Sequence, residues 1–153
     1  MPVGGGLTFA SLMAGWQHTC GLTSSGRAYC WGDHVLAGPF GDTPRLVDGN
    51  LAFVSISSGA AASHTCGVTA ANVAYCWGDN GSGQLGDGTT TSTLAPVPVA
   101  GGLALSTIAV GAEHSCAMTT ASEVYCWGSN RTGQLGTGHA SVGSTVPIRV
   151  SGQ

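Results

Sequence analysis

Short segments in which apolar and polar residues alternate recur along this chain, and they are separated by clusters of glycine, serine, threonine and asparagine. Alternation with a period of two predicts β-strands with one buried face, and the clusters predict turns. Three alternating segments, each closing on a nearby glycine, span 7–12, 51–56 and 103–108. Two further segments, 96–99 and 146–150, contain proline, which restricts a strand to a sheet edge. The pattern predicts an all-β chain.

A cassette of histidine, cysteine and tryptophan occurs three times in this pattern. His-Thr-Cys or His-Ser-Cys is followed by Tyr-Cys-Trp-Gly, with the two cysteines ten positions apart, and the copies recur after 46 and then 50 residues. That period is typical of propeller blades and solenoid modules. The cassette residues are His18, Cys20, Cys30, Trp31, His64, Cys66, Cys76, Trp77, His114, Cys116, Cys126 and Trp127.

Each cassette is consistent with a β-hairpin whose two cysteines face one another. A three-residue turn at 24–26 places Cys20 opposite Cys30, and turns at 70–72 and 120–122 do the same in the other copies, although Ser122 suits a positive φ less well than glycine. Opposed strand residues have Cα atoms about 4.5 or 5.5 Å apart, which a disulfide can span. Reduced cysteines packed in a core are the alternative. Zinc is a third and the weakest possibility, because the spacing is not that of a zinc site.

Charged residues make up only 7% of the 153 residues, against about 25% in a typical soluble domain. The formal net charge is −3, and the basic residues are four arginines with no lysine. Nucleic acid and anionic membranes are therefore not expected partners. No apolar stretch is long enough for a transmembrane helix, and the first residues lack a signal peptide. Cysteines paired at a fixed spacing favour an extracellular or periplasmic location.

The repeated motifs resemble the regulator of chromosome condensation repeat. The resemblance is carried by Gly-x-x-His-Thr/Ser-Cys, by Tyr-Cys-Trp-Gly, and by the Gly-Gln-Leu-Gly loops within 80–88 and 130–138. It implies a single repeat domain, 1–153, of three four-stranded antiparallel β-propeller blades at about 5–49, 50–102 and 103–153. Two features depart from the family: the first unit has an unrelated segment, 33–42, in place of the loop, and the family usually closes seven blades.

Three blades form only part of a ring, since known rings use about 4 to 8 blades. Residues 2–7 match 98–103, and 147–152 match 96–101, so one copy leads in register into another. Such a head-to-tail contact closes into a ring or continues as a filament. We expect the chain to partner itself, two copies forming a six-bladed ring, with excision from a longer propeller as the competing account.

The recurring histidines and tryptophans are interpreted as structural. Catalytic sites are normally unique constellations, so His18, His64 and His114 are each expected to serve their own blade through backbone in the adjacent turn, and the three cassette tryptophans to pack it. No catalytic motif occurs, so we predict no enzyme, no cofactor and no metal site. Asn80 and Asn130 stand in formal glycosylation sequons, whose use is left open because the repeat itself places Asn before the turn.

Residues that differ between the copies are the candidates for binding another protein. Loops on a rigid scaffold commonly carry recognition, although Trp16 and Phe40 are equally consistent with packing. The leading hypothesis is a secreted protein-binding scaffold or inhibitor; the alternatives are guanine nucleotide exchange on a small GTPase, which the resemblance implies, and a purely structural self-assembling element. The candidate binding residues are Trp16, His34, Phe40, Glu113 and Arg131.

Overall fold

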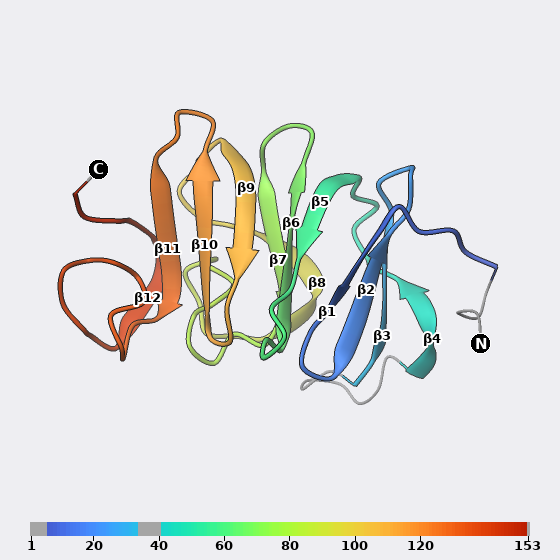
Figure 1. Cartoon of the computed structure of the whole chain (residues 1–153), viewed down its shortest axis with the longest axis horizontal. Helices are drawn as coiled ribbons and strands as arrows, with labels where there is room; N and C mark the ends of the chain where they lie inside the picture. Colours follow the sequence, from blue (N-terminus) through green and yellow to red (C-terminus); the bar gives the residue numbers. More distant parts are fainter. Residues whose placement is uncertain (1–5, 34–40, 153) are drawn as a thin grey trace.

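Twelve β-strands and no helix make up the described part of the chain, which in this computed structural model comprises residues 6–33 and 41–152. They form three four-stranded antiparallel sheets that lie side by side in chain order (Figure 1). The first sheet contains β1 (Ser11–Ala14), β2 (His18–Leu22), β3 (Ala28–Gly32) and β4 (Gly41–Leu46). The second contains β5 (Phe53–Ser57), β6 (His64–Thr69), β7 (Ala74–Gly78) and β8 (Thr93–Pro98). The third contains β9 (Leu105–Val110), β10 (His114–Thr119), β11 (Val124–Ser129) and β12 (Gly143–Arg149). Among these residues no helix could cross a membrane.

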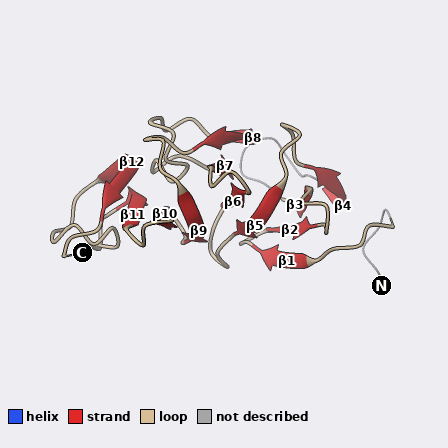
Figure 2. Ribbon diagram, turned by 90° about the horizontal axis from the view of Figure 1, so that it is seen from above, coloured by secondary structure: helices blue, strands red, loops and turns tan. Residues whose placement is uncertain are grey.

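The strands of each sheet follow one another in sequence order, and the sheets lie along an arc. Viewed from above, β4, β8 and β12 lie on the outer side of this arc, and β1, β5 and β9 on the inner side (Figure 2). Pro96 and Pro98 are in β8 and Pro147 is in β12, so proline lies on edge strands as predicted. Each sheet is thus a propeller blade, and the predicted all-β class is confirmed.

The hairpin registers are those predicted from the turn lengths. Cys20 pairs with Cys30, Cys66 with Cys76, and Cys116 with Cys126. The third turn residue has a positive φ each time: 79° at Gly26, 60° at Asn72 and 65° at Ser122. Ser122 therefore adopts the left-handed backbone that serine disfavours.

All six cysteines are joined in disulfides, one across each hairpin. The Cα atoms of each pair are 4.0–4.1 Å apart, shorter than the 4.5 Å expected for opposed residues. The disulfide alternative is the one that the structure shows. Each bond closes a loop of ten residues inside a single blade.

The first strand of the first sheet begins later than its alternating sequence predicts. The predicted segment is 7–12, whereas β1 pairs with β2 only from Ser11. The ring of Phe9 lies over Gly21, where a Cβ would come within 2.4 Å of it, and packs against Trp31 at 5.6 Å between ring centroids. Phe53 packs in the same way over Gly67 and against Trp77, yet it lies in β5, so this packing does not explain the later start of β1.

The core lies between the sheets rather than within any one of them. One cluster joins Cys20, Leu22 and Cys30 of the first sheet to Phe53 and Trp77 of the second. A second cluster joins residues of the second sheet to residues of the third: Cys66, Val68, Ala74, Cys76 and Leu85 meet Leu105, Ala117 and Trp127. Full burial of a side chain such as Val or Leu contributes about 1.5–3 kcal/mol, so each blade depends on its neighbour for stability.

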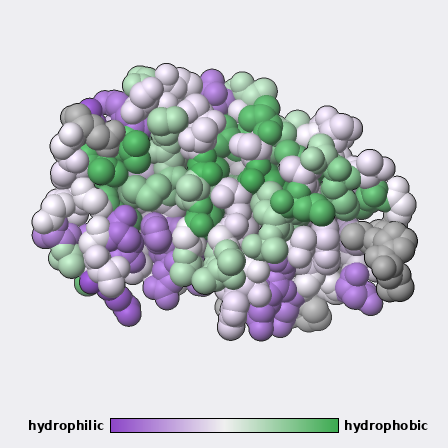
Figure 3. Space-filling view, viewed as in Figure 1, coloured by the Kyte–Doolittle hydropathy of each residue, from purple (hydrophilic) through white to green (hydrophobic). Residues whose placement is uncertain are grey.

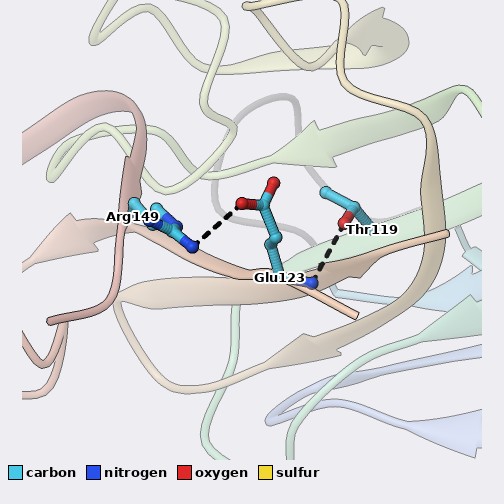
Figure 4. A network of polar contacts seen from close by, with 3 residues as sticks. All are labelled: Thr119, Glu123 and Arg149. Atoms are coloured by element: carbon cyan, nitrogen blue, oxygen red, sulfur yellow. Dashed lines mark hydrogen bonds and ion pairs between the residues drawn. The ribbon is translucent and has the colours of Figure 1, made fainter. Parts of the chain in front are cut away.

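Charged residues add little to this core. Arg149 of β12 forms a 2.9 Å ion pair with Glu123, whose backbone N–H donates to Thr119 Oγ1 at 3.1 Å (Figure 4). The two charged side chains are 49% and 39% exposed, and an exposed pair of this kind contributes about 0–1 kcal/mol. The contact fastens β12 to the hairpin turn beside it.

Candidate functional site

Loops from all three sheets meet at one rim of the arc. Trp16 follows β1, Ser63 precedes β6, and Glu113 precedes β10, so equivalent loops of successive blades lie next to one another. Together with Asp79, which follows β7, they line a shallow hollow of about 310 Å³. These loops lie along the lower edge in Figure 1, where Figure 3 shows hydrophilic side chains gathered below a more hydrophobic surface. We call Trp16, Ser63, Asp79 and Glu113 the rim site.

Trp16 is held in the rim site by its backbone, which leaves its ring exposed. Its N–H donates a 3.0 Å hydrogen bond to the carbonyl of Ala62 in the neighbouring sheet, while 62% of the residue is open to solvent. The ring of Trp16 is thus mostly open to solvent. Whether it binds a partner or packs on the shortened first blade stays a prediction.

Two carboxylates give the rim site its negative charge. The hydroxyl of Ser82 donates to Glu113 Oε2 at 3.4 Å, and Gln84 Nε2 donates to Asp79 Oδ2 at 2.8 Å. Asp79 also accepts from the Ser92 hydroxyl at 3.2 Å, so its orientation is fixed, whereas Glu113 is exposed with a single long contact. A carboxylate held by hydrogen bonds and an exposed carboxylate therefore line the same hollow as Trp16.

Arg131, which sequence comparison grouped with Trp16 and Glu113, lines a different hollow. That hollow, of about 220 Å³, lies between the loop at Gly81 and the start of β12 at Gly143. Ser82 lines it as well, and the Ser82–Glu113 contact connects it to the rim site. The structure thus brings Trp16 and Glu113 together and places Arg131 next to them, while His34 and Phe40 lie outside the described residues.

A second polar arrangement joins the sheets deep in the core. His18 Nε2 is 2.9 Å from Thr65 Oγ1, and His64 Nε2 is 2.8 Å from Ser115 Oγ. Ser115 is completely buried and donates its only proton to the carbonyl of Gln84 at 2.9 Å. His64 Nε2 must therefore be the donor to Ser115. The expectation that the histidines serve their own blades stays a prediction, and these two contacts also join each ring to the next blade.

Tryptophan completes the junction between sheets. The indole Nε1 of Trp127 donates to the same Gln84 carbonyl at 2.9 Å, and the ring lies against Gly86, where a Cβ would come within 2.6 Å of Nε1. The Gly-Gln-Leu-Gly loop of one blade is thus the acceptor for the tryptophan of the next. Sequence reasoning missed this partnership, although the fixed offsets of the hydroxyl, tryptophan and loop in the second and third units were a signal for it.

The loop itself is organised by a buried asparagine. The side chain of Asn80 accepts from the N–H of Leu85 at 3.0 Å and donates to the carbonyls of Thr89 and Thr91, and Asn130 accepts in the same way from Leu135. Both asparagines are 0% exposed. A glycan cannot be accommodated at either in the folded loop, which answers the question that the sequons left open.

His114, in the last blade, is less enclosed than His18 and His64 and lacks a following sheet in this chain. Partial burial nevertheless lowers the pKa of His114 below its ordinary 6.5, because desolvation disfavours the charged ring. Its ring lies against Gly111, just as the ring of His18 lies against Gly15. Among the described residues, no three His, Cys, Asp or Glu side chains are grouped to hold a metal ion.

Comparisons with known proteins agree with this architecture. Family models of the regulator of chromosome condensation (RCC1) repeat match residues 73–118 and 122–153, and, in a second form, 10–35, 53–84 and 106–134. No curated protein sequence matches the chain.

Solved structures with similar folds include human WBSCR16, with a TM-score of 0.81 and 19% identity, over 95% of this chain and 38% of that one. Prp20p from Saccharomyces cerevisiae has a TM-score of 0.80 and 24% identity, over 95% and 37%. The ectodomain of the Physcomitrella patens receptor kinase CR4 has a TM-score of 0.56 and 29% identity, over 85% and 33%. The chain therefore spans less than two fifths of each of these proteins. With its repeated cassettes, four-stranded blades and Gly-Gln-Leu-Gly loops, the chain belongs to the regulator of chromosome condensation (RCC1) repeat family.

Proposed function

We propose that the chain is a non-enzymatic propeller module that binds another protein through the rim site. The observation that carries the proposal is the meeting of three loops from three blades around one exposed tryptophan. Tryptophan is enriched among residues that dominate binding energy, and loops on a rigid scaffold commonly carry recognition. Prp20p, a structural relative, is described by its binding to Gsp1p and histones, which supports protein binding as the class of function.

The chemistry of the rim site favours a basic segment of the partner. Asp79 and Glu113 supply negative charge, and the face of an exposed indole attracts a cation by about 0.5–1 kcal/mol. A Lys or Arg side chain between the Trp16 ring and the Glu113 carboxylate would use both interactions.

We further propose an extracellular or periplasmic location. Three disulfides account for every cysteine, and disulfides persist in oxidising compartments. The similar CR4 structure is the ectodomain of a receptor kinase. Protein isolated from its source would show no free thiol under denaturing, non-reducing conditions, and six free thiols would contradict this location.

Self-association is part of the same proposal, because the two end blades lack neighbours within this chain. Nucleotide exchange on a small GTPase remains the alternative that family membership supports.

A display library of random peptides, panned on the immobilised chain, tests the rim site directly. We expect enriched peptides to be basic and to lose binding to Trp16→Ala and to Glu113→Gln. Val54→Ser is the matched control, since Val54 is 61% exposed and lines neither the rim site nor the hollow at Arg131. Enriched peptides that bind Trp16→Ala as well as the wild type would contradict the proposal.

A further inference from the structure

Each sheet has two different faces, and each junction in the chain joins one kind to the other. The cysteine face carries the disulfide and the residue two positions after its first cysteine, Leu22 or Val68, and it packs on the next sheet. The tryptophan face carries the tryptophan and the opposed Thr or Ser, and it packs on the preceding sheet. At both junctions the cysteine face of one sheet packs on the tryptophan face of the next, and this defines the orientation in which a further blade would dock.

The last blade presents a cysteine face that no sheet of this chain covers. Met118 occupies the position of Leu22 and Val68, yet it is 38% exposed, whereas those two are 6% and 1% exposed. The face contains a hollow of about 270 Å³ between β9, β10 and β11, and none of the residues that line it is charged. Its lining includes Cys116, Met118 and Val124.

The first blade presents the complementary tryptophan face. Trp31 is partly exposed, while its equivalents Trp77 and Trp127 are 1% and 0% exposed. Thr19, which pairs with Trp31, is likewise partly exposed, whereas the equivalent Thr65 is fully buried. Within the described part of the chain, the Trp31 indole N–H has no hydrogen-bond acceptor.

We propose that a second copy of this chain docks its tryptophan face on the cysteine face of the last blade, and that two copies close into a six-bladed ring. At each new junction His114 Nε2 forms a hydrogen bond with Thr19 Oγ1 of the other copy, as His18 does with Thr65 and His64 with Ser115. The Trp31 indole donates to the carbonyl of Gln134, as Trp127 does to that of Gln84.

The inference deepens the self-association within the proposed function and rests on it. What selects a second copy as the occupant is continuity with the internal junctions: the open faces are the two halves of one interface that the chain already makes twice. A ring of six blades lies within the range of about 4 to 8 that propellers use.

Sedimentation equilibrium of the full chain, over micromolar concentrations, tests the interface. Wild-type protein is expected as a dimer of the 15.1 kDa chain. Met118→Asp places a charge in the apolar hollow and should weaken dimerisation by about 100-fold or more, because burying an unpaired charge is costly. Val142→Asp, at a residue 91% exposed, is the control and should leave the dimer unchanged.

Circular dichroism shows whether Met118→Asp remains folded, as expected for a position that is exposed in one chain. Trp31→Ser supplies the reciprocal test from the other face. Wild-type protein that is monomeric throughout would overturn self-association altogether, whereas a dimer insensitive to both variants would overturn only this interface. Open-ended polymers that are broken by both variants would overturn the closed ring. None of these outcomes bears on peptide binding at the rim site, which is measured separately.

Discussion

The indole of Trp127 donates a 2.9 Å hydrogen bond to the carbonyl of Gln84, and this bond ties the third blade to the loop of the second. Ser115 donates to the same carbonyl at 2.9 Å, so one backbone oxygen receives two buried donors. Both lone pairs of a carbonyl are thereby used. The Gly-Gln-Leu-Gly loop serves as the receptor for the next blade.

Trp127→Phe removes one of these donors and part of a fully buried ring. We expect it to lower the free energy of unfolding by about 2 kcal/mol, from the lost hydrogen bond and the cavity left behind. Urea unfolding measures the change. Trp16→Phe, at a residue 62% exposed, is the control and should change stability by less than about 0.5 kcal/mol. Equal effects at the two sites would contradict the role assigned to Trp127.

Removal of the disulfide in the second blade, by Cys66→Ala with Cys76→Ala, should cost about 2–3 kcal/mol. The bond closes a ten-residue loop, and both cysteines are fully buried. Urea unfolding of the double variant, compared with wild-type protein under non-reducing conditions, measures the loss. Unchanged stability would show that the hairpin needs no covalent closure.

Gly15 lies so close to the His18 ring that a Cβ would come within 2.2 Å of Cε1. Gly15→Ala therefore forces the ring away from Thr65, and we expect a loss of about 2 kcal/mol. His18→Ala removes the ring, so adding Gly15→Ala to it should cost far less. The double-mutant cycle measures this coupling, and additive effects would refute it.

Asn80→Ala should destabilise the second blade by about 1–3 kcal/mol, because it leaves the N–H of the fully buried Leu85 without an acceptor and removes the bonds to the carbonyls of Thr89 and Thr91. Thr90→Ala, in the exposed part of the same loop, is the matched control. Thermal unfolding measures both variants. If Asn80 organises the loop, only Asn80→Ala should lower the unfolding temperature; equal unfolding temperatures for the two variants would contradict this role.

His114 should make stability depend on pH. Its pKa in the folded chain lies below the 6.5 of the unfolded chain, so the unfolded chain takes up the proton first as the pH falls. The contribution to stability is fully present above pH 6.5 and is lost as the pH falls from there towards the folded pKa. Urea unfolding of His114→Gln across this range should show a shallower decline than wild-type protein, and an identical decline would exclude His114 as a cause.

Local sequence determines the hairpins but not their neighbours. A three-residue turn fixes the pairing of Cys20 with Cys30, because register follows by counting from the turn. The start of β1 at Ser11 was not predictable, because residues 7–12 and 51–56 alternate alike, yet β5 begins at Phe53, the equivalent of Phe9. Alternation thus predicts that a strand exists more securely than the residue at which it begins.

The candidate sites were predictable as residues and not as arrangements. Trp16 and Glu113 were selected as candidate binding residues because they differ from the equivalent residues of the other blades. The hollow that they share depends on how successive sheets are placed, which the sequence does not give. The contacts between blades were missed for the same reason: His64 reaches Ser115, 51 positions away, only because two sheets face one another. The repeats showed that a histidine and a hydroxyl residue recur in every cassette, but they did not show that the histidine of one blade bonds the hydroxyl of the next.

The claim that the open faces reproduce the internal junctions is tested most directly by an isotope-filtered nuclear Overhauser experiment. A mixed sample would contain nitrogen-labelled and carbon-labelled copies, so that only contacts between copies are observed. We predict a cross-peak between the Trp31 indole proton of one copy and the α protons of Gly136 of the other, matching the contact of Trp127 with Gly86. No such cross-peak, together with a Trp31 indole proton that exchanges freely with water, would contradict the account.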